Sequence, residues 1–148
     1  MNRHRRIAVA VGLCTALTMS ARGAAGDVPT VDDAFSACRQ QFSAKPHHYD
    51  SAYCFYQAAV REQRWQEGTE VFDAIVREHP DNYWLPLAYG HMYRERDPGR
   101  TEALYRRAAD GFRLHGNIEG EIVSRSNLRN FLFHKGRAQD GATELQPV

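Results

Sequence analysis

Apolar side chains recur every three or four positions along almost the whole chain after Asp27, and no run alternates convincingly with a period of two. This spacing gathers apolar residues on one face of an α-helix, whereas a half-buried strand would alternate apolar and polar positions. The clearest example is the stretch Trp65–Glu78, in which Val71, Phe72 and Ile75 share a face. The pattern therefore predicts an all-α fold.

Prolines and capping residues divide this pattern into seven predicted helices. Pro80 has no N–H to continue a helical ladder, so the helix before it must end. Gly116 is the expected C-terminal glycine of a later helix. The expected N-caps are Thr30, Asp50, Asn82, Asp97 and Asn117. The predicted helices span residues 31–42, 51–62, 65–78, 83–96, 98–114, 118–133 and 138 onward, with connections of about two to five residues that favour antiparallel packing.

The helical pattern also repeats along the chain. Residues 51–82 align with residues 85–112 at a shift of about 34 positions, which places Phe55 on Tyr89. A third unit, which contains Leu128, follows at a shift of about 39 positions because the helix before it is longer. A period in this range is typical of stacked helical hairpins.

The repeated residues resemble those of the tetratricopeptide repeat family. That family's first helix has Leu-Gly followed by Tyr, and its second has Ala and a large aromatic residue before a closing Pro. "AYGHMY" supplies Tyr89, Gly90 and Tyr93, and "GTEVFDAIVREHPDN" supplies Phe72 and Pro80. The resemblance covers about residues 49–145, with "TEALYRRAAD" and "NLRNFLFHKGRAQDGA" as further matches. It departs from the family pattern at Ala52, Ala59, Arg125 and Arg129.

The resemblance implies a right-handed superhelix of about three helical hairpins over residues 49–148, with an N-terminal capping helix within residues 26–48. It also implies a concave protein-binding groove formed by the first helix of each hairpin. By repeat position, the groove residues are Tyr53, Gln57, Trp84, Leu87, His91, Arg94 and Asn130. Aromatic and arginine side chains are common anchors in such patches, but Trp84 and Tyr53 could instead cover the seam between helices. The Lys and Asn positions with which some family members clamp a peptide carboxylate are not matched here.

The first 25 residues have the pattern of a secretory signal peptide, with basic "MNRHRR", an apolar stretch from Ile7 to Ala21, and small residues at Gly23 and Ala25. A retained membrane anchor is the alternative, although a spanning helix needs about 20 apolar residues. Cleavage would remove 4 of the 19 basic residues and leave 15 against 18 acidic ones, for a net charge of −3. This charge argues against a nucleic-acid partner. We therefore expect a periplasmic or secreted protein with no membrane span in the mature chain.

Two cysteines follow the predicted cleavage point, Cys38 and Cys54. In an exported chain an even pair favours a disulfide, which would stabilise the fold by roughly 3 kcal/mol. Two buried thiols are the alternative.

Patterns for catalysis and metal binding are lacking. Of seven histidines, six follow the predicted cleavage point, and no two stand three or four positions apart on one predicted helix. The chain has no Gly-x-Ser-x-Gly elbow and no phosphate-binding glycine loop. Cys54 could form a dyad with a histidine, but a disulfide to Cys38 is the simpler role. We therefore expect no metal, no cofactor and no enzymatic activity.

The predicted function is protein binding, by a non-enzymatic adaptor or scaffold that holds a peptide segment or a protein in its groove. The main alternative is a structural module that stacks on further repeats, or on a copy of itself, through a C-terminal stripe that ends in Leu145 and Val148. Repeat arrays normally need a polar terminal cap, so a shortened relative or a fragment of a longer repeat protein also fits this stripe. An enzyme that depends on a metal or a reactive thiol is the third alternative.

Overall fold

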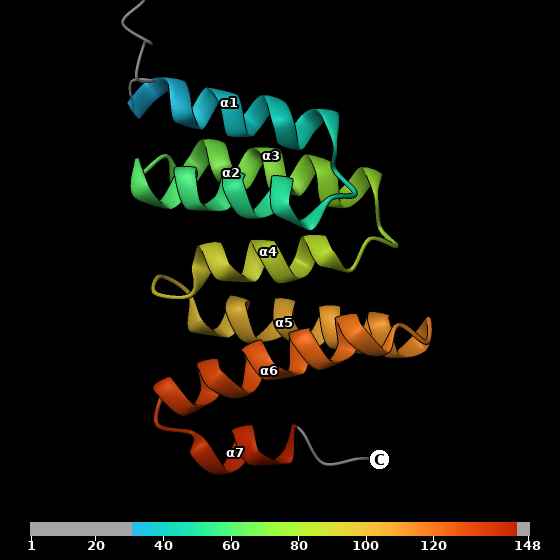
Figure 1. Ribbon diagram of the computed structural model, residues 1–148. Helices are drawn as coiled ribbons and strands as arrows, with labels where there is room; N and C mark the ends of the chain where they lie inside the picture. The colour runs from blue at the N-terminus through green and yellow to red at the C-terminus, as the bar shows by residue number, and fades with distance from the viewer. Residues whose placement is uncertain (1–30, 145–148) are drawn as a thin grey trace, which may run out of the picture.

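The computed structural model describes residues 31–144, which form seven α-helices and no strand (Figure 1). The helices are α1 (Val31–Ala44), α2 (Tyr49–Arg61), α3 (Trp65–Glu78), α4 (Trp84–Tyr93), α5 (Pro98–Leu114), α6 (Ile118–His134) and α7 (Ala138–Thr143). The predicted all-α class is confirmed for these residues. The expected signal peptide in residues 1–25, and Leu145 and Val148, lie outside the described part of the chain.

The helices are stacked along one direction, from α1 at one end to α7 at the other (Figure 1). Connections of three to five residues alternate between two sides of the stack, so consecutive helices run in opposite directions, as expected. Helix α2 also packs directly on α4, which brings side chains of both helices onto a shared surface. Within residues 31–144, no helix is both long and apolar enough to cross a membrane.

Two predicted N-caps form the expected hydrogen bonds. The backbone N–H of Arg100 donates to Oδ1 of Asp97 over 2.9 Å, and that of Gly120 donates to Oδ1 of Asn117 over 2.9 Å. Gly116 has a φ of +67°, in the left-handed region expected after α5. Local hydrogen bonding therefore determines where α5 and α6 begin.

Thr30 lies outside the described residues, and the predicted caps Asp50 and Asn82 need correction. Helix α2 begins at Tyr49, so Asp50 lies in its first turn, where a carboxylate still favours the positive end of the helix. The side chain of Asn82 accepts a hydrogen bond from the N–H of Trp84 over 3.2 Å, but Tyr83 occupies the N-cap position of α4.

Helix α4 ends at Tyr93, three residues before the predicted end at Arg96. The N–H groups of Arg96 and Asp97 both donate to the carbonyl of Tyr93 over 2.9 Å, and they form a turn directly after the helix. Pro98 favours extended geometry in the residue before it, and Asp97 accordingly has a φ of −140°. The predicted third helix matches α3, which stops two residues before Pro80.

Two clusters of buried side chains form the core of the described residues. The first cluster joins α1 to α4 through Phe35, Phe42, Phe55, Phe72 and Tyr89. The second joins α4, α5 and α6 through Leu87, Tyr105, Ala108, Phe112, Leu128, Phe131 and Leu132. Each fully buried large side chain contributes about 1.5–3 kcal/mol, so the apolar faces predicted from the helical spacing hold successive layers together.

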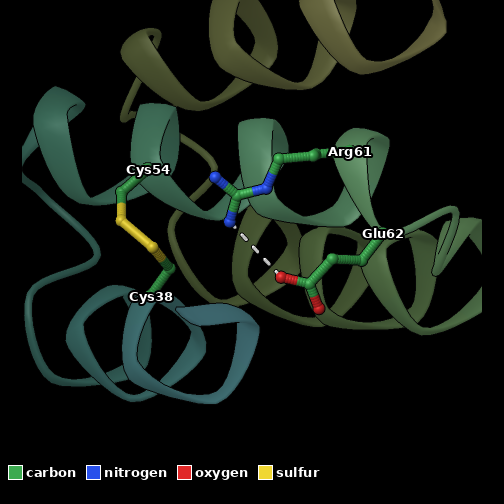
Figure 2. The surroundings of a disulfide bond; sticks show 4 residues. All are labelled: Cys38, Cys54, Arg61 and Glu62. Atoms are coloured by element: carbon green, nitrogen blue, oxygen red, sulfur yellow. Dashed lines mark hydrogen bonds and ion pairs between the residues drawn. A yellow bond between two sulfur atoms is a disulfide. The ribbon is translucent and has the colours of Figure 1, made fainter. Parts of the chain in front are cut away.

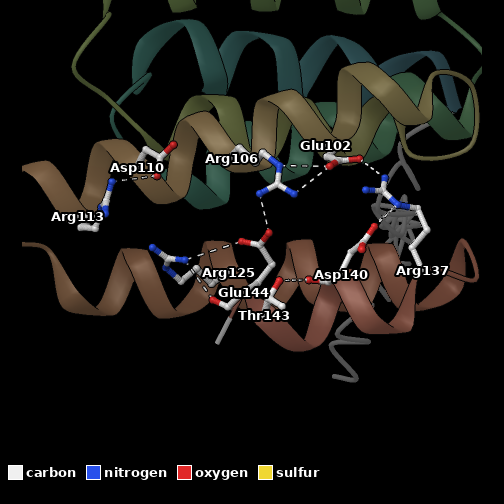
Figure 3. A network of polar contacts seen from close by, with 9 residues as sticks. All are labelled: Glu102, Arg106, Asp110, Arg113, Arg125, Arg137, Asp140, Thr143 and Glu144. Atoms are coloured by element: carbon white, nitrogen blue, oxygen red, sulfur yellow. Dashed lines mark hydrogen bonds and ion pairs between the residues drawn. The ribbon is translucent and has the colours of Figure 1, made fainter. Parts of the chain in front are cut away.

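An ion-pair network attaches the end of α7 to α5 and α6 (Figure 3). Glu144, directly after α7, accepts a hydrogen bond from Nη1 of Arg106 over 2.6 Å and lies 3.8 Å from Nη1 of Arg125. Arg106 also pairs with Glu102 at 2.9 Å. The Glu144 side chain is 12% exposed, so these pairs are partly shielded from water. Gly141 is the buried residue of α7, so polar contacts supply a large part of the attachment of this helix.

Candidate functional site

Aromatic side chains gather where α2 packs on α4. On α2 they stand at spacings of four and three, which places them on one face of the helix. On α4 two further aromatic rings lie two turns apart and meet this face, and α5 supplies one more. We call these residues the aromatic cluster: Tyr49, Tyr53, Tyr56, Trp84, His91 and Tyr105.

His91 is the centre of this cluster. Its Nε2 lies 3.2 Å from the hydroxyl of Tyr49, and its Nδ1 lies 2.6 Å from the hydroxyl of Tyr105. The ring of Tyr56 stacks on the imidazole with centroids 5.3 Å apart. A neutral imidazole has one donor and one acceptor nitrogen, so one hydroxyl donates to the ring and the other accepts from it.

Burial keeps the imidazole neutral. Desolvation, with a smaller contribution from the positive charge of Arg94, lowers the pKa of His91 to about 4. Desolvation also raises the pKa of Tyr49 to about 12, with smaller contributions from Tyr53 and Asp50. At neutral pH the cluster is therefore an uncharged, hydrogen-bonded unit.

The open part of the cluster lies along α2. Tyr53 is 37% exposed and lines a cavity of about 360 Å³ at the seam between α1 and α2. A second cavity of about 430 Å³ opens beside it, lined by Tyr56, Gln57, Val60 and Arg61. Gln57 and Arg61 line both cavities, which makes one extended hollow. Asp50, Cys54 and Ala58 of α2 also line the first cavity. We call the other five α2 residues of the hollow the α2 surface: Tyr53, Tyr56, Gln57, Val60 and Arg61.

The α2 surface combines apolar contact with hydrogen bonding. Tyr53 and Tyr56 meet edge to face with centroids 4.9 Å apart, and they present flat apolar rings. The amide of Gln57 can donate and accept, and the guanidinium of Arg61 can donate to carboxylates. Arg61 pairs with Glu62 at 3.4 Å while its own side chain stays 63% exposed, which leaves donors for a ligand. These groups suit binding of a polar chain with an apolar side chain.

A disulfide joins Cys38 of α1 to Cys54 of α2 beside this hollow (Figure 2). The two sulfur atoms are 1.94 Å apart and the Cα atoms 5.5 Å apart. The pairing expected from the sequence is therefore present. Both cysteines line the cavity at Tyr53, so the cross-link fixes α1 as one wall of the site.

Three of the predicted groove residues, Tyr53, His91 and Trp84, lie where α2 packs on α4, and a fourth, Gln57, is exposed on α2. Tyr53 and Gln57 line the hollow, and His91 lies partly buried behind it. Trp84 is also partly buried. Its ring centroid lies 5.2 Å from that of Tyr49 and 4.7 Å from that of Phe112. Trp84 therefore fills the seam between helices, which was the alternative role for it.

The other three predicted groove residues have different surroundings. Leu87 needs correction, because it is 0% exposed within the second core cluster, where α5 and α6 cover it, and it cannot line an open groove. Arg94 is partly exposed and acts electrostatically on His91. Asn130 is exposed on α6 but lines a separate cavity together with Phe133.

Tyr56 and Val60 were not among the groove residues predicted from the sequence. Each is partly buried and also lines the hollow. Tyr49 and Tyr105 were missed as partners of His91. The spacing of tyrosines at positions 49, 53 and 56 was the available signal for a shared aromatic face.

Within residues 31–144, no group of three or more His, Cys, Asp or Glu side chains is arranged to hold a metal ion. A scan against protein-family models, a search of curated proteins and a search of solved structures each found no match for this chain. Its function is therefore inferred from its residues and their geometry.

Proposed function

We propose that this chain is a non-enzymatic, tetratricopeptide-like array that binds a peptide segment of a partner protein on the α2 surface. The observation that carries the proposal is the open hollow beside Tyr53, where exposed aromatic and hydrogen-bonding groups stand on one rigid helix. Aromatic and arginine anchors supply most of the binding energy in many protein interfaces.

The hydrogen bonds of His91 support binding by a preorganised surface. Tyr49 and Tyr105 hold the imidazole from two sides, and the imidazole in turn supports the ring of Tyr56. A surface that is ordered before binding loses less conformational entropy when the ligand arrives. The aromatic cluster thus favours recognition without rearrangement.

The side chains of the α2 surface also indicate the class of ligand. An extended segment could place an apolar or aromatic residue against Tyr53 and Tyr56, and an acidic group against Arg61. The amide of Gln57 would pair with the peptide backbone. The ligand is therefore a short segment with one large apolar side chain and an acidic group at the Arg61 end of the hollow, away from the carboxylate of Asp50.

Two glycines support the repeat assignment. A Cβ at Gly90 would lie 2.6 Å from the ring of Tyr105, and one at Gly68 would lie 3.0 Å from the Cβ of Ala59. The family motif has glycine at the position of Gly90, and close helix packing gives the physical reason. The packing of α2 on both α3 and α4 fits hairpins stacked in a right-handed superhelix.

An extracytoplasmic location belongs to the same proposal. Disulfides persist in oxidising compartments, so the bond between Cys38 and Cys54 supports export. The predicted signal peptide would provide the route.

Selection from a random peptide library tests the binding proposal. Enriched peptides are measured by fluorescence anisotropy against the wild type and the Tyr53→Ala, Gln57→Ala double variant. We expect binding to weaken at least about tenfold in the double variant, because it loses an aromatic anchor and a hydrogen-bonding amide. Gln66→Ala, at an exposed position on α3, is the matched control and should bind normally. Enriched peptides that bind the double variant as well as the wild type would refute the proposed site.

A further inference from the structure

Helix α6 carries an apolar stripe that no described residue covers. Ile118, Ile122 and Phe133 are 71%, 57% and 65% exposed. With Ser126 and Arg129 they recur at spacings of four, four, three and four, so they lie on one face of the helix. Single exposed apolar residues are ordinary, but a row of them along a helix indicates a contact surface. We call these five residues the α6 stripe.

The stripe borders a cavity between α6 and α7. This cavity has a volume of about 550 Å³ and is lined by Arg129, Asn130, Phe133, Ala138 and Ala142. Helix α7 is the last described layer of the stack (Figure 1), and no described helix lies beyond this cavity. The α6 stripe and the small residues of α7 together form an open, largely apolar end face.

The corresponding face one layer earlier is covered by a helix. Leu87 of α4, which the repeat alignment places on Ser126, is fully buried with Tyr105 of α5 and Leu128 of α6. Helix α6 thus covers the face that α4 and α5 form at Leu87. No described helix covers the corresponding face that α6 and α7 form at Ser126. The end face therefore has the form of a surface that takes another helix.

Among the described residues, the opposite end of the stack has no matching apolar face. The exposed residues of α1 include Ser36, Arg39, Gln40 and Ser43. A head-to-tail contact would place the α6 stripe against these polar groups and leave them poorly hydrated. Contact between the α6–α7 ends of two copies would instead bury apolar side chains against apolar side chains. Such a contact has two-fold symmetry and gives a closed dimer.

We propose that the α6 stripe is the interface with a second copy of this chain, in which the two α6 helices lie antiparallel and cross at Ser126. Each Ile118 then faces the Phe133 end of the other helix, and the small Ser126 permits close approach. Charge is also complementary. Among the described residues neither Arg129 nor Glu119 has an ion-pair partner, and the antiparallel arrangement brings one within reach of the other across the interface. This interface is separate from the α2 surface, so its failure would leave the peptide-binding proposal intact.

Sedimentation equilibrium of the purified full chain, across the micromolar range, tests the interface. We expect a dimer that Ile122→Glu weakens at least about tenfold, because the substitution buries an unpaired charge. Ala74→Glu adds the same charge at an exposed position on α3 and should leave the dimer unchanged. Circular dichroism checks that each variant is folded. A wild-type chain that stays monomeric, or an Ile122→Glu variant that dimerises normally, would overturn the proposal; the first result would assign the stripe to a helix of another protein.

Charge reversal tests the antiparallel register. Arg129→Glu should weaken the dimer by repulsion from Glu119, and the double variant Arg129→Glu, Glu119→Arg should recover it. A double variant as weak as the single one would overturn the proposed pairing. Both positions are exposed, so the fold should tolerate the changes.

Discussion

Nδ1 of His91 lies 2.6 Å from the hydroxyl of Tyr105, so a residue of α5 orients an imidazole of α4 that supports the α2 surface. The second ring nitrogen is 3.2 Å from the hydroxyl of Tyr49 on α2. One ring thereby joins three helices. The apolar core would hold these helices together without it, but these hydrogen bonds fix the orientation of the rings that face the proposed ligand.

Removal of the Tyr105 hydroxyl should destabilise the folded protein. Tyr105→Phe keeps the buried ring and leaves Nδ1 of His91 without its partner, so we expect the free energy of unfolding to fall by about 1–3 kcal/mol. Urea denaturation followed by circular dichroism measures the change. The hydroxyl of Tyr83 makes no hydrogen bond within the described residues, so Tyr83→Phe is the matched control and should change stability little. Equal effects of the two substitutions would contradict a role for the His91 hydrogen bond.

Stability should fall in mild acid because of His91. Its pKa is about 4 in the folded protein against an ordinary value of 6.5, so between these values the unfolded chain binds more protons than the folded one. The free energy of unfolding therefore decreases as the pH drops through this window, by an amount on the order of 2 kcal/mol. Urea titrations at neutral pH and near pH 4 measure the decrease. It should be smaller in His91→Gln but retained in His134→Gln, which changes an exposed ring.

Loss of the disulfide should destabilise the chain without changing its fold. The bond links residues 16 positions apart, and closing a loop of this size contributes about 3 kcal/mol in the chain-entropy model. We expect a reducing agent to lower the urea midpoint of the wild type. The Cys38→Ser, Cys54→Ser double variant should start from that lower midpoint and not respond to the reductant. A wild-type midpoint that is the same with and without reductant would exclude a stabilising disulfide.

Gly90 should not tolerate a side chain. Its Cβ would lie 2.6 Å from the ring of Tyr105, whereas that of Gly99 would lie 3.6 Å from its nearest neighbour. Gly90→Ala should therefore destabilise the protein by about 1–3 kcal/mol through overpacking, despite the better helix propensity of alanine. Gly99→Ala, which gains the propensity without the clash, should be neutral or stabilising. Thermal unfolding of the two variants compares these effects directly.

The sequence predicted the helical layers well because their signals are local. Pro80, Asp97 and Gly116 act within one turn of their own position, and spacing alone placed Phe72 in the core. The end of α4 was harder to predict, because nothing before Asp97 in the sequence shows that the turn closes on the carbonyl of Tyr93.

The site was less predictable because it depends on contacts between helices. Repeat position alone could not show that α5 and α6 bury Leu87, or that Trp84 packs on Phe112. The same spacing rule that places a residue on an apolar stripe cannot tell a fully buried position from one at the edge, as Tyr56 shows. Gln57 lines the hollow, and there its polar side chain and its helical position agree.

The attachment of α7 by Glu144 makes the two ends of the array respond differently to ionic strength. The disulfide and the aromatic core at the α1 end are made of uncharged groups, so they offer no ion pair that dissolved ions could screen. The pairs of Glu144 with Arg106 and Arg125 are weakened by added salt, since the screening length shrinks from about 10 Å at 0.1 M to about 3 Å at 1 M. A salt titration should therefore loosen α7 first and increase amide hydrogen exchange there while the rest of the stack stays protected. The concentration of salt therefore sets how firmly α7 is attached, while the α1 end keeps its packing.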